Sequence, residues 1–152
     1  MPATPDPSLT APDRPIVPGE LLPAAGDVPL RPEAPRTTIR VVSTGDRPIQ
    51  VGSHFHLFEA NRALRFDRAA AYGLRLAIPA GTAVRFEPGE TREVEALPIG
   101  GARVVRGFHG LVEGPLDEPG MRERALERLR AGGFLDDGPA GTATAFSDGN
   151  PA

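Results

Sequence analysis

Residues 45–97 read GDRPIQVGSHFHLFEANRALRFDRAAAYGLRLAIPAGTAVRFEPGETREVEAL, a nearly unbroken series of short apolar segments separated by turn residues. Two of the turns are explicit: Pro-Ala-Gly-Thr at 79–82 and Glu-Pro-Gly-Glu at 87–90. Proline fixes a negative φ and glycine permits a positive one where a reversal needs it. We therefore expect the flanking segments to pair as hairpins in a β domain.

Strand signals extend beyond this stretch, from residue 37 to residue 112. Apolar and β-branched residues form short segments bounded by Gly, Pro and Asp, which is typical of strands. The predicted strands are TTIRVV (37–42), PIQVGSHFHLF (48–58), LRLAI (74–78), AVRF (83–86), REVEAL (92–97) and ARVVRGF (102–108). The expected fold class is all-β, with the strands of a small domain at 37–112.

The N-terminal part differs in composition. Ten prolines recur between positions 2 and 35, which withholds backbone donors too often for a helix or a central strand. Residues 1–16 are therefore expected to be a disordered, Pro-rich extension. In Val17-Pro18-Gly19-Glu20-Leu21-Leu22, apolar residues bracket a Pro-Gly turn, as they do where an extended arm docks on a surface.

A single amphipathic helix is predicted within residues 117–135. Asp117 or Glu118 can cap it with Pro119 at its first position, and the Gly-Gly pair at 132–133 can end it. Met121, Ala125 and Leu129 recur at helical spacing, with Leu126 beside them. The helix is expected to dock on the β domain or on a neighbouring subunit, because a lone helix of this length is marginal in water. Residues 136–152 show no periodicity and are expected to be a disordered tail.

Composition excludes several classes of function. The net charge is only −3, so no strong field favours nucleic acid or an anionic membrane. The absence of cysteine removes disulfides and thiolate chemistry and fits a reducing compartment, so a cytoplasmic location is expected. No apolar run approaches the roughly 20 residues of a membrane span, and no signal-peptide pattern opens the chain.

The most conspicuous reactive residues are His54 and His56. If residues 48–58 form one strand, the two imidazoles share a face. They could supply two metal ligands, but a zinc or nickel site needs three or four, and His109 lies at the far end of the strand region. The preferred interpretation is a structural role in hydrogen bonds at a subunit surface.

Other catalytic patterns are weaker. Ser53, the histidines and Asp67 include the residue types of a triad, but no glycine-flanked elbow presents the serine, and neighbours on a strand point to opposite faces. Asp46-Arg47 and Asp67-Arg68 are interpreted as local or intersubunit ion pairs rather than acid–base groups.

The chain resembles a known family over residues 17–116. TGDRPIQVGSHFH at 44–56, FDR at 66–68, GLRL at 73–76 and IPAGTAVRFEPG at 78–89 are similar to the β subunit of bacterial urease. The sequence departs from the family pattern at Ala77, where many relatives have Asp, and at Glu113, where Asn is usual.

The resemblance implies a β-clip-like fold and a non-catalytic subunit of a hydrolase that converts urea to ammonia and carbamate. In the family, two nickel ions are held by histidines, an aspartate and a carbamylated lysine of the α subunit, whereas this chain has three histidines and no lysine. The implied partners are the α and γ subunits in a trimer of αβγ units, together with the accessory proteins of urease. We assign this chain no catalytic, cofactor-binding or metal-binding residues.

A set of residues is expected at the subunit interface. Its members are Pro18, Gly19, Glu20, Asp46, Arg47, His54, His56, Asp67 and Arg68. Two alternatives stay open: a free-standing β-domain hydrolase using His54, His56 and Asp67, and a small binding module whose arm and helix capture another partner.

Overall fold

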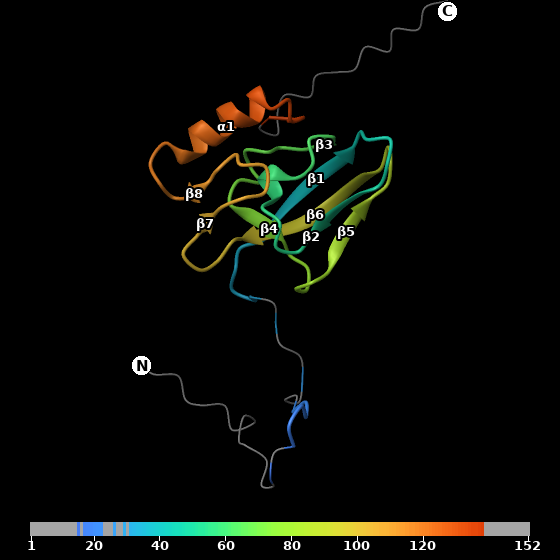
Figure 1. Ribbon diagram of the computed structural model, residues 1–152. Coiled ribbons are helices and arrows are strands. Elements are labelled where there is room, and N and C mark those ends of the chain that lie inside the picture. The colour runs from blue at the N-terminus through green and yellow to red at the C-terminus, as the bar shows by residue number, and fades with distance from the viewer. Residues whose placement is uncertain (1–14, 16, 23–25, 27–28, 30, 139–152) are drawn as a thin grey trace, which may run out of the picture.

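The computed structural model describes residues 15, 17–22, 26, 29 and 31–138. The expectations for residues 1–14, 16 and 139–152 lie outside the described residues. The folded part is all-β, as predicted, with a curled sheet and one α-helix that lies to one side of it (Figure 1). No helix in the described residues has the length and apolar character needed to cross a membrane.

The central sheet is antiparallel and has the strand order β3-β1-β6-β4. Its strands are β1 (Thr37–Ser43), β3 (Leu64–Arg65), β4 (Leu74–Leu76) and β6 (Thr91–Pro98). β1 and β6 pair along most of their length, with Ile39 opposite Val94. Ile39, Val41 and Val94 are buried, while their neighbours in the strands are exposed or, at Val42, half-buried. This alternation is what a sheet with one covered face requires.

Both predicted turns form, but the prediction that they join hairpins is wrong. Thr82 N–H donates to Pro79 O at 3.2 Å, and Glu90 N–H donates to Glu87 O at 3.0 Å. The strand between them, β5 (Ala83–Phe86), pairs with β2 (Ile49–Gly52) rather than with β4 or β6. The turn residues specify a local reversal, whereas burial of apolar faces across distant segments decides which strands pair.

β2 and β5 form a second, two-stranded sheet. The third sheet is also two-stranded and consists of β7 (Val104–Val105) and β8 (Gly114–Pro115). The strand predicted over 102–108 is therefore reduced to two paired residues. Phe108 and Glu113, in the connecting loop, have φ of 54° and 56°, outside the usual region for residues with a Cβ. The Glu113 carboxylate accepts a hydrogen bond from Gly107 N–H at 2.5 Å, which closes the loop on itself.

The folded part contains two hydrophobic cores. The sheet core comprises Ile39, Val41, Val51, Leu57, Ala60, Leu64, Phe66, Ala71, Leu76, Phe86, Val94 and Ala96. The helix core comprises Phe58, Val105, Leu111, Val112, Leu116, Met121, Ala125, Leu129 and Phe134. Leu57 and Phe58 are adjacent residues of the 3₁₀ turn η2 (Leu57–Glu59), yet they belong to different cores. η2 is therefore the junction between the cores.

The helix α1 (Met121–Ala131) presents the predicted stripe, and Met121, Ala125 and Leu129 are buried in the helix core. It docks on this chain's own β7–β8 region, as Figure 1 also shows. The predicted end at Gly132 is confirmed, whereas the predicted start is wrong. Gly120, with φ of 75°, occupies the N-cap position and offers no side-chain cap.

The two residues expected to cap α1 are engaged elsewhere. Asp117 accepts hydrogen bonds from Arg103 Nε at 2.7 Å and Nη2 at 3.0 Å, and Glu118 accepts one from Arg124 Nη2 at 2.8 Å. The hydrogen bond from Arg103 lowers the pKa of the Asp117 carboxyl below its ordinary value. A carboxylate already paired with a guanidinium is not available to the first turn of a helix.

Residues 136–138, expected to begin a disordered tail, are part of the folded structure. Asp136 forms a parallel bridge with Phe66, and Asp137 N–H donates to Phe66 O at 3.1 Å. The Asp136 carboxylate accepts a hydrogen bond from Arg68 N–H at 3.0 Å. These polar contacts order a segment whose composition offers little apolar burial.

We predict that Leu129→Ala lowers the free energy of unfolding of the isolated chain by about 2–5 kcal/mol, because it removes a fully buried side chain and leaves a cavity. Guanidinium denaturation measures the loss. Arg130→Ala, at the exposed neighbouring position, is the control and should change the stability little. Equal stabilities of the two variants would show that α1 is not packed on the domain.

Candidate functional site

His54 and His56 do not share a face, so that prediction is wrong. β2 ends at Gly52, Phe55 N–H donates to Gly52 O in a turn, and His56 opens the 3₁₀ turn η2. His54 is consequently exposed, whereas the side chain of His56 has no exposed surface. The extended strand over 48–58 is interrupted because local hydrogen bonds replace the cross-strand bonds after Ser53, whose N–H still donates to Thr82 O.

His56 and Glu59 form a fully buried polar pair. His56 Nδ1 lies 2.7 Å from Glu59 Oε2, and both side chains are inaccessible to solvent. The other carboxylate oxygen, Oε1, accepts a hydrogen bond from Leu111 N–H at 2.8 Å. The backbone oxygen of Glu59 lies 2.6 Å from His109 Nδ1. Glu59 therefore ties the β7–β8 loop to η2.

The second nitrogen of His56 fixes the tautomer of its neutral ring. Gly73 N–H donates to Nε2 at 2.9 Å, so Nε2 must be the acceptor. The ring proton is accordingly assigned to Nδ1, from which it is donated to Glu59 Oε2. Both ring nitrogens are used within the chain, and neither has a lone pair left for a metal.

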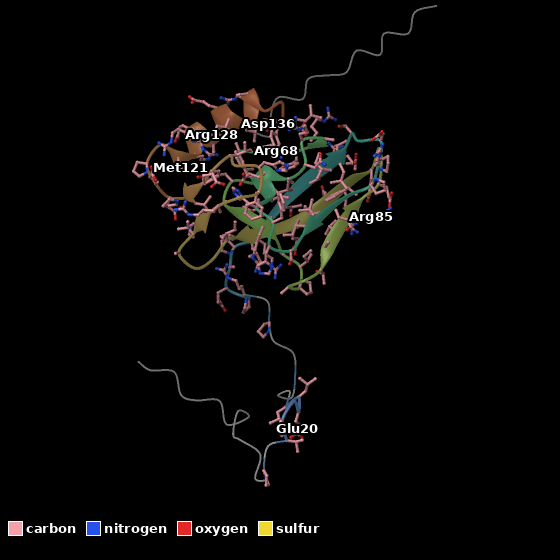
Figure 2. The ribbon with its side chains drawn as sticks, viewed as in Figure 1. Glu20, Arg68, Arg85, Met121, Arg128 and Asp136 are labelled. Atoms are coloured by element: carbon pink, nitrogen blue, oxygen red, sulfur yellow. The ribbon has the colours of Figure 1, made fainter. Side chains whose placement is uncertain are left out.

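Among the described residues, Arg68 has the largest fully buried side chain. Its guanidinium donates to five backbone carbonyls at 2.6–3.0 Å: those of Phe58, Ala60, Asn61, Leu64 and Leu135. A guanidinium has five N–H donors, so every one of them is paired. The group also stacks on Phe66 and Phe134, at 4.3 and 5.1 Å from the ring centres. Figure 2 shows Arg68 and Asp136 close together below the C-terminal end of α1.

Burial lowers the pKa of Arg68 to about 10, and the nearby Asp136 carboxylate opposes this shift. The group still carries its charge at neutral pH. A charged guanidinium whose donors are all paired with carbonyls stabilises the segments that carry those carbonyls. Moving any one segment away would leave a buried polar atom unpaired.

The nine residues expected at an interface fall into different environments. Pro18 and Gly19 form the predicted turn, in which Glu20 N–H donates to Val17 O at 3.0 Å. Asp46 and Arg47 are highly exposed, with Arg47 Nε 4.0 Å from Asp46 Oδ1.

The remaining four residues divide between the interior and the surface. The Asp67 carboxylate accepts a hydrogen bond from Ala70 N–H at 2.8 Å, which stabilises a local turn. The side chains of His56 and Arg68 are likewise used inside the chain. The interface hypothesis therefore rests on the exposed members of the set, which include His54.

Ser53 and His54 are closer than a strand would allow. Ser53 Oγ lies 2.8 Å from His54 Nδ1, and it also accepts a hydrogen bond from Gly81 N–H at 3.2 Å. The expectation that neighbouring residues point apart is wrong here, because the chain turns at this point. Ser53 is nonetheless buried, and Asp67 is engaged in its own turn, so these residues do not form an exposed triad.

The described residues contain no cluster of three or more His, Asp or Glu side chains that could hold a metal ion. A nickel or zinc site needs at least three such ligands. The donor sets of these residues therefore do not fit a resident metal centre.

Sequence reasoning missed the roles of Glu59, His109 and Asp136. One signal was available: Glu59 follows His56 by three residues, a spacing that brings side chains together in a helical turn. The contacts of His109 and Asp136 join segments separated by 50 and 68 residues, and no local pattern reports them.

We predict that Glu59→Gln destabilises the isolated chain by about 1–3 kcal/mol, although the two side chains have the same shape. The single oxygen of the amide can accept a hydrogen bond from Leu111 N–H or from His56 Nδ1–H. The NH₂ group then faces the other N–H group, and two donors cannot form a hydrogen bond. If the His56 ring proton moves to Nε2 instead, that nitrogen can no longer accept the hydrogen bond from Gly73 N–H. Thermal unfolding measures the effect, with the exposed Glu127→Gln as control; identical melting of the two variants would refute the hydrogen-bond assignment.

Comparison with known proteins places these features in a family. A family model described as urease beta subunit matches residues 18–115. Urease subunit beta of Haloarcula marismortui is 58% identical over 125 residues, covering 82% of this chain and 89% of the relative. Urease subunit beta of Haloquadratum walsbyi is 53% identical over 122 residues, covering 80% of this chain and 97% of the relative. Urease subunit gamma/beta of Pseudomonas syringae pv. syringae is 54% identical over 114 residues, which are 75% of this chain and 49% of that longer protein. The chain belongs to the urease β subunit family.

Proposed function

We propose that this chain is the non-catalytic structural β subunit of a nickel-dependent urease. In this proposal it scaffolds the α subunit that carries the two nickel ions, and α, β and γ subunits assemble as a trimer of αβγ units. The observation that carries the proposal is the match to the urease β subunit model over residues 18–115. The hydrolysis of urea to ammonia and carbamate belongs to the partner's metal centre.

The internal use of the polar groups supports a scaffolding role. His56, Glu59 and Arg68 have no exposed surface, and their partners are atoms of the same chain. A catalytic group must reach the reacting atoms of a substrate. These three residues instead stabilise the shape that the chain presents to its partners.

Exposed apolar side chains supply surface for assembly. Val17, Leu21 and Leu22 on the arm are 57%, 89% and 49% exposed. Phe108, 46% exposed, packs edge-on against Phe55 with ring centres 4.7 Å apart. Clusters of exposed apolar residues are typical of surfaces that other chains cover.

The γ partner is inferred from the names of relatives. Two Pseudomonas syringae relatives are named urease subunit gamma/beta, and this chain spans about half the length of each. In those proteins γ and β share one polypeptide. We infer that a γ subunit also accompanies the β subunit in the assembly of this chain.

The test is co-expression of this chain with the urease α and γ subunits and the accessory proteins from the same source. We expect the three subunits to co-purify in equal amounts, with nickel and urease activity in the complex. The isolated chain, incubated with nickel, should neither bind the metal tightly nor hydrolyse urea, since its residues offer no three-ligand cluster in the described part. Urea turnover by the isolated chain, or its failure to join α and γ, would contradict the proposal.

A further inference from the structure

A cationic hollow lies beside the point where the chain enters the sheet. Its volume is about 480 Å³, and it is lined by Arg31, His54, Arg75, Ile99, Gly100 and Gly101. Three of these residues carry nitrogen donors, and none of the described lining residues is acidic. The chain as a whole is acidic, with a net charge of −3, so the positive hollow is a local feature.

Arg75 gives the hollow an incompletely paired guanidinium. The residue lies in β4 and is only 9% exposed. Within the described residues, its guanidinium makes one hydrogen bond, from Nη1 to Leu76 O at 3.1 Å, and no ion pair. Arg68, by contrast, pairs all five N–H donors with carbonyls. A nearly buried guanidinium with free donors favours an oxyanion from outside the chain.

Arg31 is held at the same hollow by a specific local structure. Its Nη1 donates to Pro98 O at 2.6 Å, and its backbone φ of 43° lies in the left-handed region. A Cβ at position 100 would lie 3.1 Å from this nitrogen, so Gly100 leaves room for the guanidinium. This hydrogen bond holds the guanidinium of Arg31, an exposed residue, near the sheet.

His54 adds a third donor group. The contact between Ser53 Oγ and His54 Nδ1 holds the ring. Gly81 N–H already donates to Ser53 Oγ, so the serine hydroxyl can donate to Nδ1. The neutral imidazole then carries its proton on Nε2 and has a donor to offer.

We infer that this hollow, called here the carboxylate pocket, receives an acidic side chain of a partner subunit. The inference rests on the proposed role as a urease subunit. Two guanidinium groups and an imidazole match the acceptors of an Asp or Glu carboxylate. The volume is many times the roughly 30 Å³ of one water molecule, so an acidic side chain on a protein loop fills the pocket better than a small free anion.

The experiment measures the affinity of this chain for the purified αγ partner complex by biolayer interferometry. Arg31→Gln and Arg75→Gln should each weaken binding tenfold or more. Arg31→Lys and Arg75→Lys should retain part of the affinity, because they keep the charge but lose the planar fork. Arg130→Gln, which removes the same charge from an exposed position of α1, should change the affinity less than twofold.

The outcomes separate the pocket from the proposed function. If the unmodified chain fails to bind αγ, the proposed function is wrong, and the pocket assignment that rests on it falls as well. If the unmodified chain binds and Arg31→Gln binds equally well, the pocket assignment alone is wrong. Circular dichroism shows whether Arg75→Gln folds, and the result with Arg31→Gln decides the matter even if it does not. An equal loss with Arg130→Gln would also overturn it, because the effect would then be one of net charge.

A second arm tests for a small-anion site. Acetate or inorganic phosphate is titrated into the isolated chain and followed by ¹⁵N chemical shifts of Gly100 and Gly101. We expect weak binding at most, with the affinity for αγ still dependent on Arg31. Tight anion binding that Arg75→Gln abolishes, together with unchanged αγ affinity of both Gln variants, would assign the pocket to a free anion and contradict the inference.

Discussion

The five hydrogen bonds of the Arg68 guanidinium are the constraint on which the rest of the folded structure depends. They gather carbonyls from residues 58–64, which begin within the 3₁₀ turn η2 and follow it, and the carbonyl of Leu135 beyond α1. The same side chain lies between Phe66 of the sheet core and Phe134 of the helix core. The two small cores are held in one arrangement because a single buried guanidinium pairs with backbone carbonyls of the segment 58–61, of β3 and of the C-terminal segment.

The buried pair of His56 and Glu59 completes this junction and explains why residues of catalytic type serve a structural purpose. Glu59 reaches the β7–β8 loop through Leu111, and His56 reaches the start of β4 through Gly73. The side chains left at the surface, including His54 and the turn at Pro18-Gly19, are available to partners. This division between a closed polar interior and an exposed surface is what the proposed scaffolding role requires.

Local patterns in the sequence predict the local features of this fold. The segment at 83–86 is a strand with the predicted limits, the turns at 79–82 and 87–90 form, and the stripe of Met121, Ala125 and Leu129 is buried. Strand pairing could not be predicted, because β5 joins β2 across more than thirty residues on the basis of burial rather than turn chemistry. The links of His56 to Gly73 and of Arg68 to Leu135 could not be predicted either, since these partners are distant in sequence.

Native-state hydrogen exchange of the isolated chain tests the central claim most directly, namely that the junction joins the two cores into one cooperative unit. The amides of Gly73 and Leu111 donate to the buried pair, so they open only when the junction breaks. The account predicts that they exchange with the same opening free energy as the amides paired between β1 and β6, because both require global unfolding. Exchange of Gly73 and Leu111 through a much smaller opening free energy, with the β1–β6 amides still protected, would contradict it.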